Sequence, residues 1–567
     1  MKLSFAKLGV SILVLGVGSS LWAAPTPKAS SSVPTPLSDW RSSPLIVGLE
    51  EELSRSMQKL TLPDAAPPYY GAYWLIEFHD LDLKASLGRI VQNQEDHGRR
   101  ASVQLRVGDP SLDNSNFAGE GGSGFLASSD GLLMAPSDDD LLALRRVYWL
   151  ASDATYRDAV ELLDQKRAQR SAQVELESRP ADFSKQEPES LDGPPASVLP
   201  SSAELEALIV AVSKVFADYP GVEDSSVSAS ARTLTRSVVS SEGVVSREPS
   251  TLIEFQLQCS AQAKDGMPLV HTVSSFGVPS EAQLSERARA LASGLIETAN
   301  AELASDSFGP VLFTDVAAAQ IAHELLAMNL AGTPDGEELQ GPFARRLGKR
   351  VLPDDFDAFD DPGLEHYRGL ALAGHYLMDD EGVRAQRVSL VEKGRLASFL
   401  MSRTPNRVIG ASNGHGRSGL SGWARGMVGN LIVETRKGAT RATLEKRLLA
   451  AARDQRAEFG IVIERLAERA FATGGASPPV PERAYKLYAD GRRVPIRGAE
   501  LGEINVRELR SLLGSGDHPN VYNYVVTWPS GLASPSSVVA PDLLFEEVEL
   551  TKTKRSYRRP KLLPRPN

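Results

Sequence analysis

The chain has 567 residues, of which 42% are hydrophobic and 24% are charged, and its formal net charge is -10 at pH 7. This composition is typical of a soluble globular protein, and the length predicts two or three domains. The negative charge argues against nucleic acid as the main partner, because the phosphate backbone favours positively charged surfaces.

The first 24 residues have the pattern of a secretory signal peptide. Lys2 and Lys7 precede the apolar run "LGVSILVLGVGSSLW", and Ala23 and Ala24 supply the small residues of a cleavage site. The run is shorter than the about 20 apolar residues that span a membrane, so no membrane anchor is expected after cleavage. The sequence therefore predicts an exported protein, periplasmic or extracellular, with a flexible leader over residues 25–40.

Residues 41–200 are predicted to form an N-terminal α/β domain. Alternating apolar and polar residues predict strands in "GAYWLIEFHDLDLKASLGRIVQ" and "ASVQLRVGD". Two helices are predicted next, in "DDDLLALRRVYWLAS" and "SDATYRDAVELLDQKRAQRSAQVE", with Ser137 and Asp138 as natural caps of the first. The acidic, Pro-rich stretch "RPADFSKQEPESLDGPPASVLPSS" predicts a linker or a surface loop at the end of this domain.

Residues 201–305 are predicted to form a central domain. A helix in "AELEALIVAVSKVFADY" precedes two strands in "ARTLTRSVVSSEGVVSREPS", which meet at a Ser-Glu-Gly turn, and a third in "STLIEFQLQCSAQA". An amphipathic helix follows in "SEAQLSERARALASGLIETANAELAS". Cys259, the one cysteine, lies in the third strand and cannot form an intramolecular disulfide. We expect a structural thiol, because no histidine lies close to it in the sequence.

Residues 306–550 are predicted to form a C-terminal domain, followed by a basic tail over residues 551–567. A strand runs into a helix in "GPVLFTDVAAAQIAHELLAMNLAG", and "RVSLVEKGRLASFLMSR" predicts a hairpin that turns at Glu392-Lys393-Gly394. A helix in "ATLEKRLLAAARDQRAEF" and strands in "FGIVIERL", "ERAYKLYADGRRVPIRG" and "SVVAPDLLFEEVEL" complete the pattern. The fold class predicted is α+β, with mainly antiparallel sheets and flanking helices in several domains.

His323 and Glu324 form a His-Glu pair in the helix that Thr314 or Asp315 caps and Gly332 closes. His323 shares an apolar stripe with Val316, Ala319, Leu326 and Leu330, which favours a histidine that faces the core. The alternative is a zinc ligand, since a His-Glu-x-x-His helix places two zinc-binding histidines on one face and a glutamate base between them. No second histidine follows here, so this stretch by itself is a weak metal motif.

Short motifs around this helix occur in an order that resembles one protein family. They are "GPVLFTDVAAAQIAHELL", "DDPG" at Asp360–Gly363, "MDDEGVRAQRVSLVEKGRLASFLMSR" at Met378–Arg403, "SNGHGR" at Ser412–Arg417 and "ARGMVGNLIVE" at Ala424–Glu434. With these motifs the chain resembles the TldD/PmbA family of metallopeptidases and their inactivated relatives. The upstream stretches "YYGAYWLIEF", "RVGDPSLDNSNF" and "SSEGV" are similar to that family too, so the resemblance spans most of the chain after the leader.

The resemblance implies a zinc site of the form His-Glu-x-x-x-His with a distant cysteine. His323 and Glu324 match the first ligand and the catalytic glutamate, but Met328 stands at the second histidine and Val526 at the expected cysteine. The glycine and the acidic residue that accompany the family's second histidine are also missing, since Ala327 and Ala331 stand there. Zinc is therefore possible by resemblance but is expected to be absent.

Other residues of this region are candidate stand-ins for the lost ligands. The histidines are His366, His375 and His415, of which His415 in a Gly-rich loop is the best candidate, although a structural role is expected for it. The run Asp379-Asp380-Glu381 suggests a hard-cation site, but a turn and a solvated hairpin start are the preferred interpretation.

Three functions remain open from the sequence. The first is a non-catalytic family member that binds an extended peptide by strand addition, or that serves as a partner subunit in a homodimer or in a heterodimer with a catalytic relative. The second is an active zinc peptidase with a rebuilt site that uses His323 as ligand and Glu324 as general base. The third is a secreted protein that keeps the architecture alone. An open sheet edge that faces His323 would support peptide binding over the third possibility.

Overall fold

The computed structural model describes residues 40–117, 132–172, 179–334, 338–420, 423–468, 479–528, 530–555 and 557–558. The chain divides into two units, Met1–Trp40 and Arg41–Asn567, and the second contains all the elements discussed below. The predicted signal peptide, nearly all of the leader, and most of the predicted basic tail lie outside the described residues. Within the part that the structure describes, no helix has both the length and the apolar character needed to cross a membrane.

The first sheet has eight strands in the order β3-β2-β1-β6-β7-β5, with β4 pairing with β2 and β8 with β7. It combines strands from residues 41–200 with strands from residues 201–305, because β1 pairs antiparallel with β6 from Ala72 opposite Ser240 to Ala85 opposite Val227. The turn predicted at Ser-Glu-Gly joins β6 to β7, and Gly243 takes a positive φ of 98° there. The strands are β1 (Pro68–Ser86), β2 (Arg89–Asp109), β3 (Leu112–Asp113), β4 (Leu133–Ala135), β5 (Ser190–Asp192), β6 (Asp224–Ser240), β7 (Val245–Gln262) and β8 (Pro268–Phe276).

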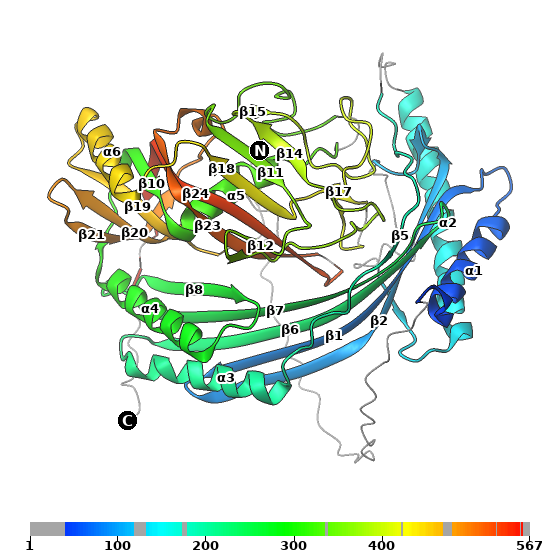
Figure 1. The fold of residues 1–567 in the computed structure, drawn as a ribbon, viewed down its shortest axis with the longest axis horizontal. Coiled ribbons are helices and arrows are strands. Elements are labelled where there is room, and N and C mark those ends of the chain that lie inside the picture. The colour runs from blue at the N-terminus through cyan, green and yellow to red at the C-terminus, as the bar shows by residue number, and fades with distance from the viewer. Residues whose placement is uncertain are drawn as a thin grey trace, which may run out of the picture. The chain divides into compact units, whose positions relative to one another are not determined.

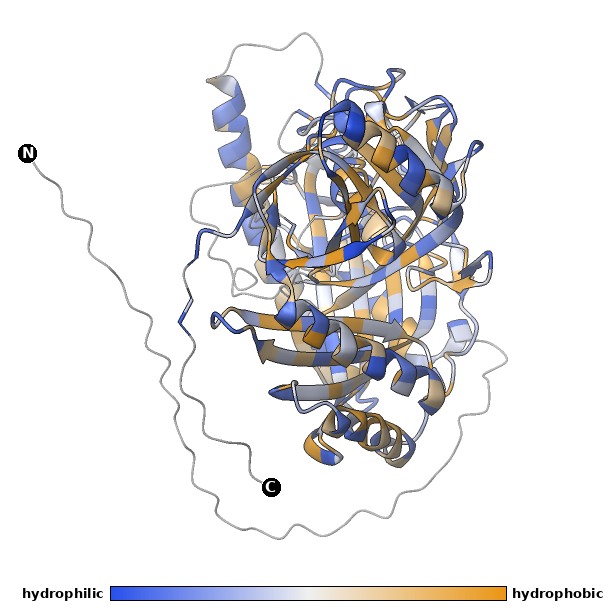
Figure 2. Cartoon of the chain, turned by 90° about the vertical axis from the view of Figure 1, so that its left-hand side faces the viewer, coloured by the Kyte–Doolittle hydropathy of each residue, from blue (hydrophilic) through white to orange (hydrophobic). Residues whose placement is uncertain are grey.

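Four amphipathic helices flank this sheet: α1 (Pro44–Lys59), α2 (Leu141–Ser171), α3 (Ser202–Lys214) and α4 (Glu281–Asn300). In Figure 1, α3 and α4 lie along the face of β6, β7 and β8 that points away from the second sheet. Their apolar residues pack on those strands in one core cluster, while polar residues remain outside, as the alternating colours of Figure 2 show. Each of the two helices begins at a complete capping box, on Ser201 and on Ser280.

The helix α2 differs from the prediction in two respects. It is a single helix of 31 residues, where the sequence predicted two, and its N-cap is Asp140 rather than Ser137 or Asp138. The Asp140 side chain accepts a hydrogen bond from the amide of Ala143. No glycine or proline separates the two predicted segments, so the backbone has no reason to break at Ser152 and Asp153.

The second sheet has twelve strands in the order β15-β14-β11-β18-β24-β10-β19-β20-β21-β9, and β22 and β23 also pair with β24. The long strand β24 is its centre, since β10, β18, β22 and β23 all pair with it. The predicted hairpin is confirmed, with Lys393 and Gly394 at positive φ between β14 and β15. The strands are β9 (Glu302–Leu303), β10 (Ser307–Phe313), β11 (Phe356–Asp360), β14 (Val388–Glu392), β15 (Arg395–Leu396), β18 (Asn430–Thr435), β19 (Phe459–Leu466), β20 (Pro481–Tyr488), β21 (Arg493–Arg497), β22 (Ala499–Leu501), β23 (Gly514–Thr527) and β24 (Ala533–Lys552).

Two helices, α5 (Asp315–Leu325) and α6 (Arg441–Asp454), pack on the second sheet, and α5 is buried in its largest core cluster. Two short hairpins, β12 (His366–Tyr367) with β13 (Leu370–Ala371) and β16 (Gly416–Arg417) with β17 (Arg425–Gly426), complete the architecture. The fold is α+β with mostly antiparallel sheets, as predicted. The division into domains at residues 200 and 305 stays a prediction.

Candidate functional site

The helix α5 carries His323 in its last turn. The helix stops at Leu325 instead of continuing to Gly332 as predicted, and a short 3₁₀ turn, Ala327–Asn329, follows it. The Asn329 side chain donates to the carbonyl of Leu325 at 3.1 Å, which satisfies an acceptor that the helix end leaves open. Ala319, His323, Leu326 and Leu330 of the predicted stripe are buried and Val316 is partly buried, but Leu326 and Leu330 lie beyond the helix end. Every residue from Ala317 to His323 is buried, so the helix is enclosed on all faces instead of along one stripe.

His323 packs between the helix and two tyrosines of β23. Its ring lies edge-on to Tyr524, with centroids 4.5 Å apart, and to Tyr522, with centroids 5.9 Å apart. The two tyrosine rings stack on each other at 5.3 Å. The side chain of His323 is 1% exposed, and its Nδ1 lies 3.8 Å from Oε1 of Glu324, whose side chain is partly exposed. His323 is therefore enclosed by aromatic groups on its strand side.

The positions where the resemblance places the other ligands do not complete a metal site. Met328 lies in the 3₁₀ turn with 60% of its surface exposed, so its side chain points toward solvent. Val526 is an apolar residue of β23 that packs against the core cluster of the second sheet. Ala331 forms an isolated bridge with Leu400 and has no side-chain donor to offer.

The donors near His323 do not fit the zinc ion that the resemblance implies. Zinc in proteins is held by at least three nitrogen, sulfur or carboxylate ligands. Throughout the described ranges, no three or more side chains of His, Cys, Asp and Glu are grouped so that they could hold a metal ion. Burial raises the pKa of the hydroxyls of Tyr522 and Tyr524 above the ordinary value, so neither is a ready anionic ligand.

The other histidines of the region do not replace the missing ligands. His415 is fully buried, and its Nε2 lies 3.0 Å from Oδ1 of Asp360 while its Nδ1 lies 2.9 Å from the carbonyl oxygen of Asn413. These contacts give His415 the structural role that was expected. His375 contacts the carbonyl oxygen of Pro362 at 3.0 Å through Nδ1, and His366 lies in β12 with its side chain exposed.

The run Asp379-Asp380-Glu381 is buried, so the prediction of a solvated hairpin start is wrong. Asp380 forms ion pairs with Arg236 of β6 and Arg417 of β16, and its Oδ2 accepts hydrogen bonds from the amides of Ser418 and Gly419. The indole of Trp74 in β1 donates to the Asp380 carbonyl at 3.0 Å. This run therefore connects the two sheets, which a reading of local sequence could not reveal.

The two outer carboxyls of the run share one buried space. Oδ2 of Asp379 accepts from the amide of Gly416 at 2.8 Å, and Oε2 of Glu381 accepts from the amide of Arg403 at 2.5 Å. Any side chain at Gly416 would meet both carboxyls, since its Cβ would lie 2.5 Å from Oε2 of Glu381 and 3.1 Å from Oδ2 of Asp379. Burial, reinforced by the repulsion of the neighbouring acids, raises the pKa of Asp379 to about 6 and that of Glu381 to about 7.

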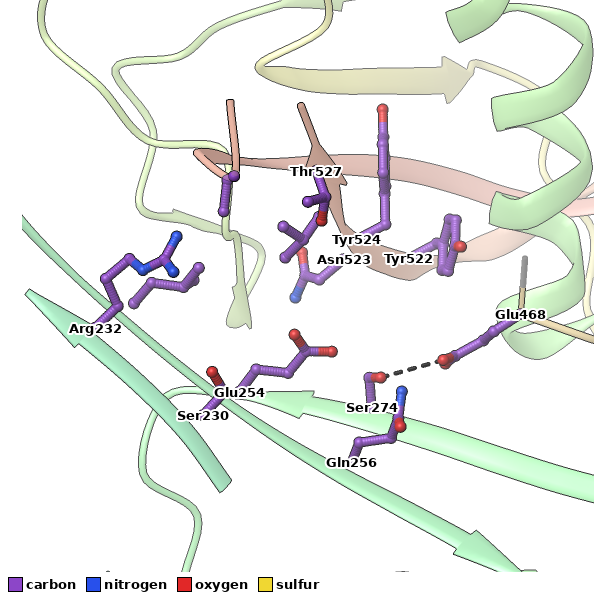
Figure 3. Close-up of a pocket in the computed structure, with 14 residues that line it drawn as sticks. Ser230, Arg232, Glu254, Gln256, Ser274, Glu468, Tyr522, Asn523, Tyr524 and Thr527 are labelled. Carbon is purple, nitrogen blue, oxygen red and sulfur yellow. Dashed lines mark hydrogen bonds between the residues drawn. The ribbon is translucent and has the colours of Figure 1, made fainter. Parts of the chain in front are cut away.

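A cavity of about 310 Å³ lies between the first sheet and β23 (Figure 3). On one side it is lined by β6, β7 and β8, and on the other by residues 522–527 of β23 together with Glu468, which follows β19. A second cavity of about 570 Å³ continues from it, because Arg232, Leu252 and Ala533 line both. Together they form a cleft between the two sheets, within the volume range of ordinary ligand sites.

The edge of β23 borders this cleft. From Asn520 to Thr527, β23 pairs with β24 along one edge, and no other strand of the described chain pairs with it there. The side chain of Asn523 contacts the hairpin β12–β13, donating to the carbonyl of Ala371 at 3.0 Å. The sheet thus leaves an open edge beside the two tyrosines that enclose His323.

A cysteine–histidine pair that the sequence did not suggest occurs in the first sheet. Antiparallel pairing of β7 with β8 places His271 directly opposite Cys259. Both are buried, and burial raises the pKa of the Cys259 thiol to about 12 and lowers that of His271 to about 4. A neutral thiol beside a neutral imidazole is not a nucleophile, so the expected structural role of Cys259 holds on physical grounds. The signal that could have found this pair is the hairpin register, which hydrophobic patterning alone does not fix.

Parts of the chain are similar in sequence to metallopeptidases. Residues 306–552 match the family model described as the PmbA/TldA metallopeptidase C-terminal domain. A metalloprotease of Archaeoglobus fulgidus is 38% identical over 73 residues, which cover 13% of this chain and 16% of that protein. The matched segment is thus a small part of that relative.

Solved structures share the fold over nearly the whole chain. A candidate modulator of a DNA gyrase from Thermotoga maritima has a TM-score of 0.59 at 15% identity and covers 88% of this chain and 100% of its own. TldE from Thermococcus kodakarensis has a TM-score of 0.56 at 13% identity, covering 89% of this chain and 100% of its own. A candidate modulator of DNA gyrase from Bacteroides thetaiotaomicron has a TM-score of 0.56 at 10% identity, covering 89% of this chain and 98% of its own. The matched C-terminal domain, the local likeness to a metalloprotease and the shared architecture agree with the ordered sequence motifs, and the C-terminal domain over residues 306–552 belongs to the TldD/PmbA family.

Proposed function

We propose that this chain is an exported member of the TldD/PmbA family that has lost the zinc chemistry of its relatives and binds an extended peptide. Zinc is plausible for any member of a metallopeptidase family, and the proposal is that this member does without it. The proposal of export, to the periplasm or out of the cell, is supported by the signal-peptide pattern of residues 1–24.

The surroundings of His323 carry the proposal. The ring of Tyr524 lies 4.5 Å from that of His323, where a zinc site would need further donors. Met328 points to solvent, and the partly buried Val526 packs against the core cluster of the second sheet. Neither side chain is an ordinary zinc ligand. Loss of two direct ligands is expected to weaken zinc binding by more than the about 10–100-fold that follows loss of a single outer partner.

The open edge of β23 supports peptide binding. An extended peptide that adds a strand to a sheet edge gains backbone hydrogen bonds, and its alternate side chains enter the neighbouring pockets. The edge from Asn520 to Thr527 borders the cleft between the sheets and lies next to Tyr522 and Tyr524. An open edge close to His323 is the arrangement that favours a peptide-binding module over a protein that keeps the architecture alone.

A role as partner subunit follows from the same loss of chemistry. A member that binds peptide but does not cleave it can present substrate to a catalytic relative in a heterodimer, or can act as a homodimer. The proposal of a partner subunit is supported by the fold that the chain shares with TldE and two other solved structures over 88% to 89% of its length.

The second candidate is a zinc-dependent peptidase with a rebuilt site. The adjacency of Glu324 to His323, with 3.8 Å between Oε1 and Nδ1, favours it, because the family's glutamate and first histidine are both in place. Under this alternative, hydrolysis of peptides should depend on Glu324 more than on any other carboxylate.

Metal content separates the two candidates. The purified chain and a His323→Ala variant are dialysed mildly, and zinc is measured by elemental mass spectrometry. We expect less than a tenth of an equivalent, on the order of the background, in both samples. Near-stoichiometric zinc that disappears in His323→Ala, together with casein hydrolysis that Glu324→Gln abolishes, would establish the peptidase instead.

Peptide binding is tested separately, with fluorescent hexapeptides and fluorescence anisotropy. We expect binding that Thr527→Arg weakens, because a long charged side chain in the cleft blocks the edge of β23, while Met328→Arg on the exposed turn leaves binding unchanged. Binding that neither substitution changes would place the peptide elsewhere.

A further inference from the structure

The cavity beside β23 has two carboxylates on opposite walls. Glu254 stands on β7, and Figure 3 shows its carboxylate directed toward Asn523 across the cavity. Glu468 reaches in from the end of β19, and its Oε2 accepts a hydrogen bond from the Ser274 hydroxyl of β8 at 3.2 Å. The two acids come from different sheets and face the same space.

Neither carboxylate forms an ion pair within the described chain, although the positive charge of Arg465 acts on Glu468. The guanidinium of Arg232, which also lines the cavity, forms an ion pair with Asp80, with Nε 2.6 Å from Oδ1. Arg465 forms an ion pair with Glu482, with Nη1 3.5 Å from Oε1. No ion pair joins a described lysine or arginine to Glu254 or Glu468. Burial raises the pKa of both carboxyls, and the negative charge of Glu468 adds to the rise at Glu254.

The remaining wall suits a cation as well. Tyr522 lies at the wall beside Glu468, whereas the ring of Tyr524 points away from the two carboxylates (Figure 3). Aromatic faces attract ammonium and guanidinium groups. A metal ion is a poorer fit, because within the described residues these two acids are not part of any group of three metal-binding side chains. The lining near the carboxylates thus combines the ring of Tyr522, two carboxylates and the amide of Gln256, which together suit an organic cation.

The position of the cavity connects it with the open edge. A peptide paired with β23 places every second side chain on the same face, so one of them meets the cavity that residues 522–527 line. We propose that this cavity binds a cationic nitrogen of the peptide, either a lysine or arginine side chain or the N-terminal amine, between Glu254 and Glu468. This inference rests on the proposed peptide binding and adds a substrate class to it, namely basic peptides.

The test compares isosteric peptides on the full chain. Acetylated hexapeptides with one central lysine, or with norleucine in its place, carry a dye at the C-terminus and are titrated by fluorescence anisotropy. We expect the lysine peptide to bind roughly tenfold more tightly, as a charge-assisted contact with a buried carboxylate allows. The double variant Glu254→Gln/Glu468→Gln should erase that preference, while Glu286→Gln, which neutralises an exposed carboxylate on α4, should keep it.

Two further comparisons distinguish a terminal amine from a basic side chain, and the cation site from peptide binding itself. A norleucine peptide with a free N-terminus that regains the tenfold preference would assign the cavity to the terminal amine, and no gain would assign it to the basic side chain. Equal binding of lysine and norleucine peptides, or a preference that survives the double variant, would overturn this inference and leave peptide binding intact. No binding of any peptide would overturn the proposed function itself.

Discussion

His323 and Tyr524 meet edge to face, with ring centroids 4.5 Å apart, at the position where the family's zinc chemistry would begin. The histidine comes from the end of α5 and the tyrosine from β23, and Tyr522 stacks on the same tyrosine at 5.3 Å. The three rings form one packed unit inside the core of the second sheet. Through these contacts the side chain of His323 packs as part of the core.

A double-mutant cycle on His323 and Tyr524 tests this packing. His323→Ala and Tyr524→Ala should each lower the free energy of unfolding, by about 2–4 kcal/mol, because both remove buried side chains. Their coupling should be about 0.5–1.5 kcal/mol in the absence of added metal, as for other aromatic pairs. Urea denaturation followed by tryptophan fluorescence measures these values. A coupling that appears only when zinc is added would contradict the aromatic packing and favour the metal site.

The buried run Asp379-Asp380-Glu381 predicts a pH dependence of stability. Glu381 has its pKa raised from 4.5 to about 7, so the folded protein holds a proton that the unfolded chain releases between those values. The unfolded state then binds fewer protons, and the free energy of unfolding falls as the pH rises through this window, by at most about 1.4 kcal/mol per pH unit for each proton. Asp379, raised to about 6, adds to the same fall.

The substitution Glu381→Gln should flatten this dependence. Glutamine keeps an acceptor for the Arg403 amide and mimics the protonated acid. As the pH rises from about 5 to about 7, the free energy of unfolding of the variant should therefore increase relative to that of the wild type. Denaturant unfolding at several pH values measures the difference between the two proteins. Parallel curves for wild type and variant would show that Glu381 is ionised throughout.

The ion pair between Asp380 and Arg236 is expected to hold the two sheets together. Arg236→Ala removes the partner of a buried carboxylate and should lower the free energy of unfolding by about 3–5 kcal/mol. Arg384→Ala serves as the matched control, because its pair with Glu189 is exposed on both sides and should contribute about 1 kcal/mol or less. Differential scanning calorimetry of the wild type and the two variants checks the ranking. Equal losses of unfolding free energy in both variants would show that the buried pair contributes no more than the exposed pair.

Cys259 should resist chemical modification as long as the protein is folded. Its side chain is buried and its thiol has a pKa of about 12, so both access and thiolate are lacking at neutral pH. Iodoacetamide labelling followed by mass spectrometry should proceed at the rate of unfolding, and urea should accelerate it. Fast labelling of the native protein would show that β7 and β8 open locally.

Much of the local structure could be predicted from the sequence because it depends on near neighbours. Period-2 and period-3.6 patterns predicted the long strands and the helices, and the Lys393-Gly394 turn predicted the hairpin that the structure shows. The ordered motifs of residues 306–434 sufficed for the family, since the family model, the metalloprotease likeness and the shared fold agree with them. Helix ends were less predictable, as the termination of α5 at Leu325 shows, because the side chain of Asn329 ends the helix before Gly332.

The sequence by itself determined that Met328 and Val526 stand where the family's ligands are expected, because residue identity is independent of folding. Only the tertiary structure decided what His323 contacts, since Tyr524 lies 201 positions from His323 in the chain and meets it through the pairing of β23 with β24. Asp380 is a second example. Its local sequence predicted a solvated acid, but in the structure it is buried and paired with Arg236 from the other sheet. Contacts between distant segments depend on register and sheet packing, which a local pattern of hydrophobic residues does not specify.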